Sequence, residues 1–122
     1  MKNKNTAIEF IGISEKEYTV YSYLIRALPG GEIVGDCQLR VGAGLDTIGN
    51  IGYSVDEEYR NRGHATYACA RLLEHARSLG LEKAYAVCKK DNTASIRVCE
   101  KLGGIPDGDT DKCVRFCFSP KK

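Results

Sequence analysis

The chain has 122 residues and a hydrophobic content of 43%, which is enough for one domain around a single core. Its 18 lysines and arginines barely outnumber its 16 acidic residues, and the net charge of +2 argues against a nucleic-acid-binding surface. No stretch resembles a signal peptide, and no apolar run is long enough to span a membrane. We therefore expect a single cytoplasmic domain over residues 1–122 that binds neither nucleic acid nor membrane.

The chain contains six cysteines, an even number that would permit disulfides. Most of them fall within expected helices and strands, where small apolar residues belong. No Cys-x-x-Cys pair occurs, so no zinc or other metal site is expected. Buried, reduced thiols in a cytoplasmic protein are therefore favoured over a disulfide framework. The cysteines are Cys37, Cys69, Cys88, Cys99, Cys113 and Cys117.

The first part of the chain reads as a series of strands. Residues 1–17 form a poorly defined segment, in which 7–13 is compatible with a short strand. Residues 18–28 are rich in aromatic and β-branched side chains, and the turn at 29–31 predicts a hairpin with the next strand. Residues 33–41 alternate between apolar and polar side chains, as a half-buried antiparallel strand does.

A further strand is expected over residues 48–55, and it leads into a glycine-bearing loop. Its glycines, Gly49 and Gly52, indicate either a bulge beside a ligand or a twisted edge. In the loop, Gly63 lets the backbone approach a ligand, and the following helix begins with free N–H groups and a partial positive charge. Such a junction suits a pyrophosphate. A plain strand-to-helix turn with two solvated arginines explains the loop alone equally well.

A helix over residues 63–79, closed by Gly80, is the clearest expected element. His75 lies off its apolar stripe and is expected on the solvated surface. In the loop, the backbone N–H of His64 is expected to matter more than its ring.

The last part predicts a strand over residues 82–88, a helix over 93–102 with Asn92 as N-cap, and a strand over 112–118. Residues 105–111 read as a turn-rich connection. The strand–helix–strand order around the first helix indicates a parallel or crossover arrangement. The expected fold class is therefore α+β, with a mixed, largely antiparallel central sheet and two main helices.

Two motifs in this order resemble the GCN5-related N-acetyltransferase (GNAT) superfamily. Residues 60–65, Arg-Asn-Arg-Gly-His-Ala, fit the family's Arg/Gln-x-x-Gly-x-Gly/Ala loop between a strand and a long helix. Residues 91–103 resemble its second-helix signature, especially in the ribosomal-protein N-terminal acetyltransferase branch. The resemblance covers residues 18–118 and implies the GNAT-like acyl-CoA N-acyltransferase fold with acetyl-CoA as co-substrate.

The resemblance also implies which residues bind CoA. The loop amides would hold the pyrophosphate, and the strand before the loop would pair with the pantetheine arm through its backbone. The asparagine before the second helix would contact the cofactor. In this chain the loop residues are Arg60, Asn61, Arg62, Gly63, His64, Ala65 and Thr66, the strand residues are Tyr53, Ser54 and Val55, and the asparagine is Asn92.

Three departures from the family pattern concern the chemistry. Cys99 stands at the position of the family's general-acid tyrosine, although a thiol with a pKa of about 8.5 leaves as thiolate at modest cost. Residues 48–55 and 85–88 contain no carboxylate as general base, so that Asp36 and Asp46 remain as candidates acting through water. Only about 17 residues precede the strand at 18–28, and they do not look helical. The acceptor side is therefore short, or another chain completes it.

The absence of a general base affects which amine the protein can acetylate. A lysine amine with a pKa of about 10.4 is neutral in only about one part in a thousand at pH 7.4, which costs roughly 4 kcal/mol, whereas an α-amine with a pKa of about 7.7 costs a few tenths. We therefore expect an N-acetyltransferase that moves the acetyl group of acetyl-CoA to a primary amine, either a protein α-amine or a small molecule, by direct attack in a ternary complex. The short acceptor side also predicts a homodimer.

Two other functions remain open. A CoA-binding module that lost its acceptor site and works as a sensor or subunit would also fit the missing acid and base. A nucleotide-binding domain is less favoured, because the Gly-Lys-Ser/Thr run that holds phosphate and metal is absent.

Overall fold

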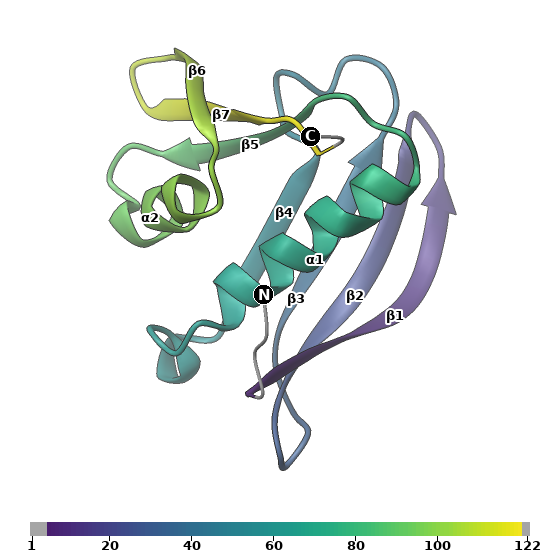
Figure 1. Cartoon of the computed structure of the whole chain (residues 1–122), viewed down its shortest axis with the longest axis vertical. Coiled ribbons are helices and arrows are strands. Elements are labelled where there is room, and N and C mark those ends of the chain that lie inside the picture. Colours follow the sequence, from purple (N-terminus) through teal and green to yellow (C-terminus); the bar gives the residue numbers. More distant parts are fainter. Residues whose placement is uncertain (1–4, 121–122) are drawn as a thin grey trace.

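The computed structural model describes residues 5–120, which form two antiparallel sheets. The strands of the larger sheet are β1 (Thr6–Glu15), β2 (Thr19–Ala27), β3 (Glu32–Val41) and β4 (Ile51–Val55), and those of the smaller sheet are β5 (Ala84–Lys89), β6 (Ile105–Asp109) and β7 (Cys113–Phe118). The larger sheet has the order β1-β2-β3-β4 and the smaller one the order β5-β7-β6 (Figure 1).

Two helices connect these sheets. The first, α1 (His64–Ser78), follows a single 3₁₀ turn, η1 (Glu57–Tyr59), and packs across one face of the larger sheet (Figure 1). The second, α2 (Thr93–Lys101), packs against α1 and β5. The stripe predicted from the sequence is the buried face of α1, where Ala68, Cys69, Leu72 and Ala76 are fully buried in the core.

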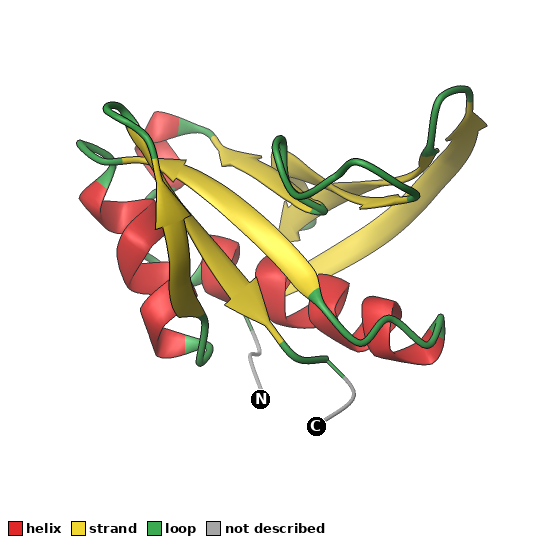
Figure 2. Cartoon of the chain, turned by 90° about the horizontal axis from the view of Figure 1, so that it is seen from above, coloured by secondary structure: helices red, strands yellow, loops and turns green. Residues whose placement is uncertain are grey.

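No helix covers the opposite face of the larger sheet among the described residues (Figure 2). Alternation along β3 turns Cys37 and Leu39 into the core and leaves Asp36 exposed. The alternating pattern of this strand was therefore interpreted correctly.

The expected fold class is confirmed, and most elements lie within two residues of their predicted bounds. The segment compatible with a short strand is the ten-residue β1, which pairs with β2 along its length except at a bulge near Gly12. The parallel relation expected across α1 is reduced to one point of contact between β4 and β5, because the two strands lie in different sheets.

Two boundaries were wrong. The strand expected from residue 48 begins at Ile51, because the Gly49 N–H donates back to Leu45 O at 2.7 Å and Gly49 has a φ of +90°. The connection expected over residues 105–111 contains the strand β6. All five of its residues are exposed, so no alternation of buried and exposed side chains marked it in the sequence.

His75 is not a solvated residue, as the sequence had suggested. Its Nδ1 lies 2.6 Å from the hydroxyl of Tyr23, and its ring packs edge-on against Tyr21 at 4.6 Å. The face of α1 that packs on the larger sheet is therefore wider than its apolar residues alone indicate. It includes His75, because tyrosine side chains of β2 contact the ring of His75.

Candidate functional site

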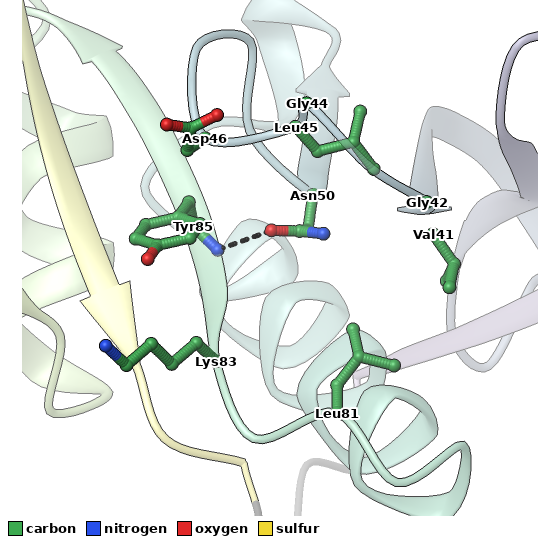
Figure 3. Close-up of a pocket in the computed structure, with 9 residues that line it drawn as sticks. All are labelled: Val41, Gly42, Gly44, Leu45, Asp46, Asn50, Leu81, Lys83 and Tyr85. Carbon is green, nitrogen blue, oxygen red and sulfur yellow. Dashed lines mark hydrogen bonds between the residues drawn. The ribbon is translucent and has the colours of Figure 1, made fainter.

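β4 and β5 lie side by side only where both begin. The Asn50 N–H donates to Tyr85 O at 2.7 Å, and the Tyr85 N–H donates to Asn50 Oδ1 at 2.8 Å (Figure 3). Beyond this junction no backbone hydrogen bond joins the two strands within residues 5–120. The two sheets therefore diverge from one fixed point.

The edge of β4 that faces β5 is unpaired beyond the junction. The Asp56 N–H donates to Val34 O in β3, so ladder alternation also turns the backbone groups of Ser54 toward β3 and those of Tyr53 and Val55 toward β5. Among the described residues β5 pairs only with β7, so its facing edge is unpaired there as well. Of the strand residues expected to meet pantetheine, Tyr53 presents unpaired backbone groups and Val55 an unpaired N–H, since Val55 O accepts from Arg60. The backbone groups of Ser54 lie in the β3 ladder.

The loop between η1 and α1 presents a set of free N–H groups. Asn61 and Gly63 have φ values of +63° and +86°, both in the left-handed region. The first N–H of α1 with a backbone acceptor is that of Tyr67, which donates to Gly63 O at 3.0 Å. The N–H groups of residues 61–66 have no hydrogen-bond acceptor among the described residues. Together with the helix dipole they form an anion-binding end.

The two arginines of the loop are less free than the sequence suggested. Arg60 Nε donates to Val55 O at 2.9 Å, so its side chain fixes the loop to the end of β4. Arg62 lies over the ring of Tyr59, with its guanidinium carbon 5.5 Å from the ring centroid. Their charges remain near the helix start, but Arg60 serves first as a structural tie.

His64 is tied to the N-terminal strand through its ring. Its Nδ1 lies 2.6 Å from Thr6 Oγ1, and both residues are buried. The ring therefore has a structural contact in the core, in addition to the backbone N–H that the sequence singled out. Thr6 lies 58 positions earlier in the sequence, so no local pattern marked the contact.

The lowered pKa values of the two histidines predict that the free energy of unfolding decreases in acid. Burial lowers the pKa of His64 from its usual 6.5, with the charge of Arg62 adding to the effect, and burial lowers that of His75. The folded state therefore holds both rings neutral, whereas the unfolded chain takes up protons as the pH falls below 6.5, so the free energy of unfolding falls there. We expect the melting temperature to drop between about pH 7 and pH 5, and less steeply in His64→Gln. A melting temperature that is flat or rises on acidification would contradict this.

The N-terminus of α2 holds a second polar group beside the diverging strands. Asn92 Oδ1 accepts from the Ser95 N–H at 3.1 Å, which confirms Asn92 as the N-cap. The hydroxyls of Ser95 and Tyr53 are 2.8 Å apart and join α2 to β4. Burial raises the pKa of Tyr53, so its phenol stays protonated at neutral pH. Sequence reasoning missed this pair, although Ser95 stands three residues after the N-cap.

Cys99, which aligns with the family's acid, is fully buried, and its Sγ lies 3.7 Å from that of Cys88. It points at another thiol in the core, whereas the Tyr53–Ser95 pair supplies hydroxyl groups beside the edge of β4. We therefore expect Cys99→Ser to change kcat less than about tenfold, since the isosteric hydroxyl keeps the packing. Steady-state rates with Cys69→Ser as control measure this. A loss of several hundredfold in Cys99→Ser alone would make Cys99 a catalytic residue.

Two hollows lie beside the junction. One, of about 270 Å³, is bounded by the β3–β4 loop and the segment before β5, including Asp46, Asn50, Leu81 and Lys83 (Figure 3). The other, of about 280 Å³, lies between the same loop and the smaller sheet, with Asp46, Val87, Asp109 and Arg115 among its lining residues.

Asp36 and Asp46, the two carboxylates considered as general base, lie in different places. Asp46 borders both hollows, and its Oδ2 lies 3.7 Å from Arg115 Nη1. Asp36 is exposed on the uncovered face of β3 and lines neither hollow. Of the two, only Asp46 is placed near the β4–β5 junction. Within residues 5–120 no group of three side chains could hold a metal ion, and no helix is long and apolar enough to cross a membrane.

Comparison with known sequences identifies the class. The model of the acetyltransferase (GNAT) domain family matches residues 2–105, which is most of the chain. The chain therefore belongs to the GNAT acetyltransferase domain family. The curated relative YnaD of Bacillus subtilis strain 168, described as an uncharacterized N-acetyltransferase, is 32% identical over 65 residues, which make up 52% of this chain and 38% of YnaD. The matched segment thus spans well under half of that relative.

Solved structures share the fold. A GNAT-family acetyltransferase from Bacillus anthracis has a TM-score of 0.70 at 21% identity, over 83% of this chain and 67% of its own. Spermidine N-acetyltransferase from Vibrio cholerae, a dodecamer, has a TM-score of 0.76 at 11% identity, over 97% and 95%. The ribosomal L7/L12 α-N-protein acetyltransferase RimL, in complex with CoA held by a disulfide to a cysteine, has a TM-score of 0.70 at 19% identity, over 84% and 63%.

Proposed function

We propose that the protein is an acetyl-CoA-dependent N-acetyltransferase that transfers the acetyl group to a primary amine by direct attack in a ternary complex. One observation carries the proposal. The unpaired edge of β4 runs directly into a loop whose N–H groups are free at the start of α1. An extended amide chain suits the first feature and a pyrophosphate suits the second, and CoA contains both in this order.

The pantetheine arm would pair with the backbone of Tyr53 and Val55, although Val55 O already accepts from Arg60. The pyrophosphate would bind the N–H groups of residues 61–66. Asn92 would contact the cofactor through its Nδ2 group, because its Oδ1 already accepts the α2 cap hydrogen bond.

The chemistry needs a neutral amine and a proton for the leaving group. The amine nitrogen attacks the thioester carbon, and an unpaired N–H on the β4 edge stabilises the oxyanion. The C–S bond then breaks, and the CoA thiolate takes a proton from Ser95, which the Tyr53 hydroxyl replaces through their 2.8 Å contact. A proton from water then restores the Tyr53 phenol. The proton of the attacking amine leaves through water toward Asp46.

The hollow between Asp46 and Arg115 is the proposed entrance for the acceptor amine. Its carboxylates are already partly paired, since Arg115 contacts Asp46 and Asp107, and Lys90 contacts Asp109. No strong base stands free, which favours an amine of low pKa such as a protein α-amine. RimL, whose name states an α-N-protein substrate, supports this choice among the fold relatives.

The test is acetyl-CoA turnover with an amine panel at pH 7.4. Peptides with free α-amines, peptides with a blocked α-amine and a free lysine, and spermidine should be compared at equal concentration. We expect the α-amine peptides to react fastest. Faster turnover of spermidine would replace the protein acceptor by a polyamine, and tight CoA binding without any turnover would favour the sensor or subunit function. Equal competition by ATP and CoA would favour a nucleotide-binding domain.

A homodimer is also proposed. The edge strand β1 exposes Phe10, Ile11 and Ile13 by 51%, 54% and 56%, and a second copy could pair with this edge about a twofold axis. Sedimentation equilibrium at micromolar concentration should give the dimer mass, and Ile11→Lys should give the monomer. Ile105→Lys on the exposed edge strand of the other sheet is the matched control. A wild-type monomer would refute the proposal.

A reducing cytoplasmic location is proposed as well. All six cysteines are free thiols in the structure, four of them buried. Thiols persist unpaired in the reducing cytoplasm rather than in secreted proteins.

A further inference from the structure

Two buried thiols meet between β5 and α2. Cys88 Sγ and Cys99 Sγ are 3.7 Å apart, close to van der Waals contact, and their residues are 6% and 0% exposed. The proposed acetyl transfer uses neither sulfur. The contact joins α2 to β5, and Cys88 stands at the C-terminal part of β5, on its core face.

The surroundings of the pair favour loss of one proton. Hydrogen bonds from Cys99 and then from Ser95 lower the pKa of Cys88, against the effect of burial, because both stabilise its thiolate, and the same contact raises the pKa of Cys99. The thiolate is the reactive form of cysteine. The other two core cysteines differ, because burial raises the pKa of Cys37 and that of Cys69 to about 12 and keeps both protonated. The Cys88–Cys99 pair thus differs from the other core cysteines, because one of its thiols loses a proton more readily.

We propose that Cys88 and Cys99 are a modification site, where a hydroperoxide such as hydrogen peroxide forms a reversible disulfide. The Cys88 thiolate attacks a peroxide oxygen, the O–O bond breaks, and the departing hydroxide is protonated to water. Cys99 sulfur then attacks the Cys88 sulfenic acid, the S–O bond breaks, and the leaving hydroxide takes the Cys99 proton. Two thiols are oxidised, and one peroxide is reduced to two water molecules.

Disulfide formation would alter the proposed catalytic site through α2. The two sulfurs must approach from 3.7 Å to about 2.05 Å, so α2 and β5 shift relative to each other or their side chains rotate. Ser95 lies one turn before Cys99 on α2, and its hydroxyl contacts Tyr53. This consequence rests on the proposed function, because it assumes that the Tyr53–Ser95 pair serves the leaving thiolate. The disulfide itself does not.

The experiment treats the reduced full-length protein with a small excess of hydrogen peroxide and removes the excess with catalase. We expect a mass loss of two hydrogen atoms per chain. Trypsin cuts after Lys83, Lys89, Arg97 and Lys101, so the disulfide should join peptides 84–89 and 98–101. Dithiothreitol should separate them, and turnover should fall by about tenfold or more on oxidation and recover with the thiol.

Matched variants decide the outcome. Cys88→Ala and Cys99→Ala should each abolish the mass loss, whereas Cys69→Ala, another buried thiol, should behave as wild type. Oxidation of Cys88 to sulfinic acid without a cross-link, a disulfide between other cysteines, or a mixed disulfide with added CoA in place of the 88–99 link would overturn the proposal. If the reduced protein shows no acetyl transfer, the proposed function fails, while the mass and peptide results still decide the disulfide.

Discussion

Gly63→Val should raise the Kd for CoA by about a hundredfold or more while the chain stays folded. Gly63 has a φ of +86° at the N-cap of α1, where a β-branched residue is strained by about 1–2 kcal/mol. The backbone would relax toward negative φ and turn the neighbouring N–H groups away from the phosphates. Losing two hydrogen bonds to a charged group costs about 3 kcal/mol or more, which is about a hundredfold in affinity. Calorimetric titration of the folded variant measures the change.

The chain offers a matched control for the backbone strain. Gly80 follows α1 at the other end, has a φ of +80°, and a Cβ there would meet nothing within 4 Å. Gly80→Val should therefore lower the melting temperature about as much as Gly63→Val does, without weakening CoA binding. If both variants bind CoA as the wild type does, the loop is not the phosphate site.

Ser95→Ala should lower kcat by about tenfold to a hundredfold and leave the KM for acetyl-CoA within about threefold. A positioned acid contributes about 10²–10⁴-fold, and the upper part of this range is not expected because a thiolate is a good leaving group. Tyr53→Phe should produce a similar loss, and the double variant should be no worse than either single one, since the two hydroxyls act as one unit through their 2.8 Å contact.

Thr93→Ala provides the control on the same helix. Thr93 is exposed at the first position of α2, so its hydroxyl is removed without touching the Tyr53–Ser95 pair. It should keep the wild-type kcat. An unchanged kcat in Ser95→Ala would mean that the pair only fastens α2 to β4, and the proton would then have to come from water.

The sequence by itself determined the elements whose signals are local. The apolar stripe of α1 repeats with the period of a helix and is buried as predicted, and β3 turns its apolar residues inward. The sequence also identified Asn92 as an N-cap and a glycine loop before α1 at Gly63. Both features depend on a few neighbouring residues. The strand β6 was not predicted from the sequence, because both of its faces are exposed and no alternation marks it.

Only the tertiary structure decided which side chains meet. Thr6 and His64 are 58 positions apart, Tyr53 and Ser95 are 42 apart, and Cys88 and Cys99 belong to different elements. Their contacts follow from how β1, β4 and α2 pack around α1, and packing between distant segments leaves no periodic trace in the sequence. The same holds for the divergence of β4 from β5. It depends on one backbone hydrogen bond between Asn50 and Tyr85, after which each strand finds its partners in a different sheet.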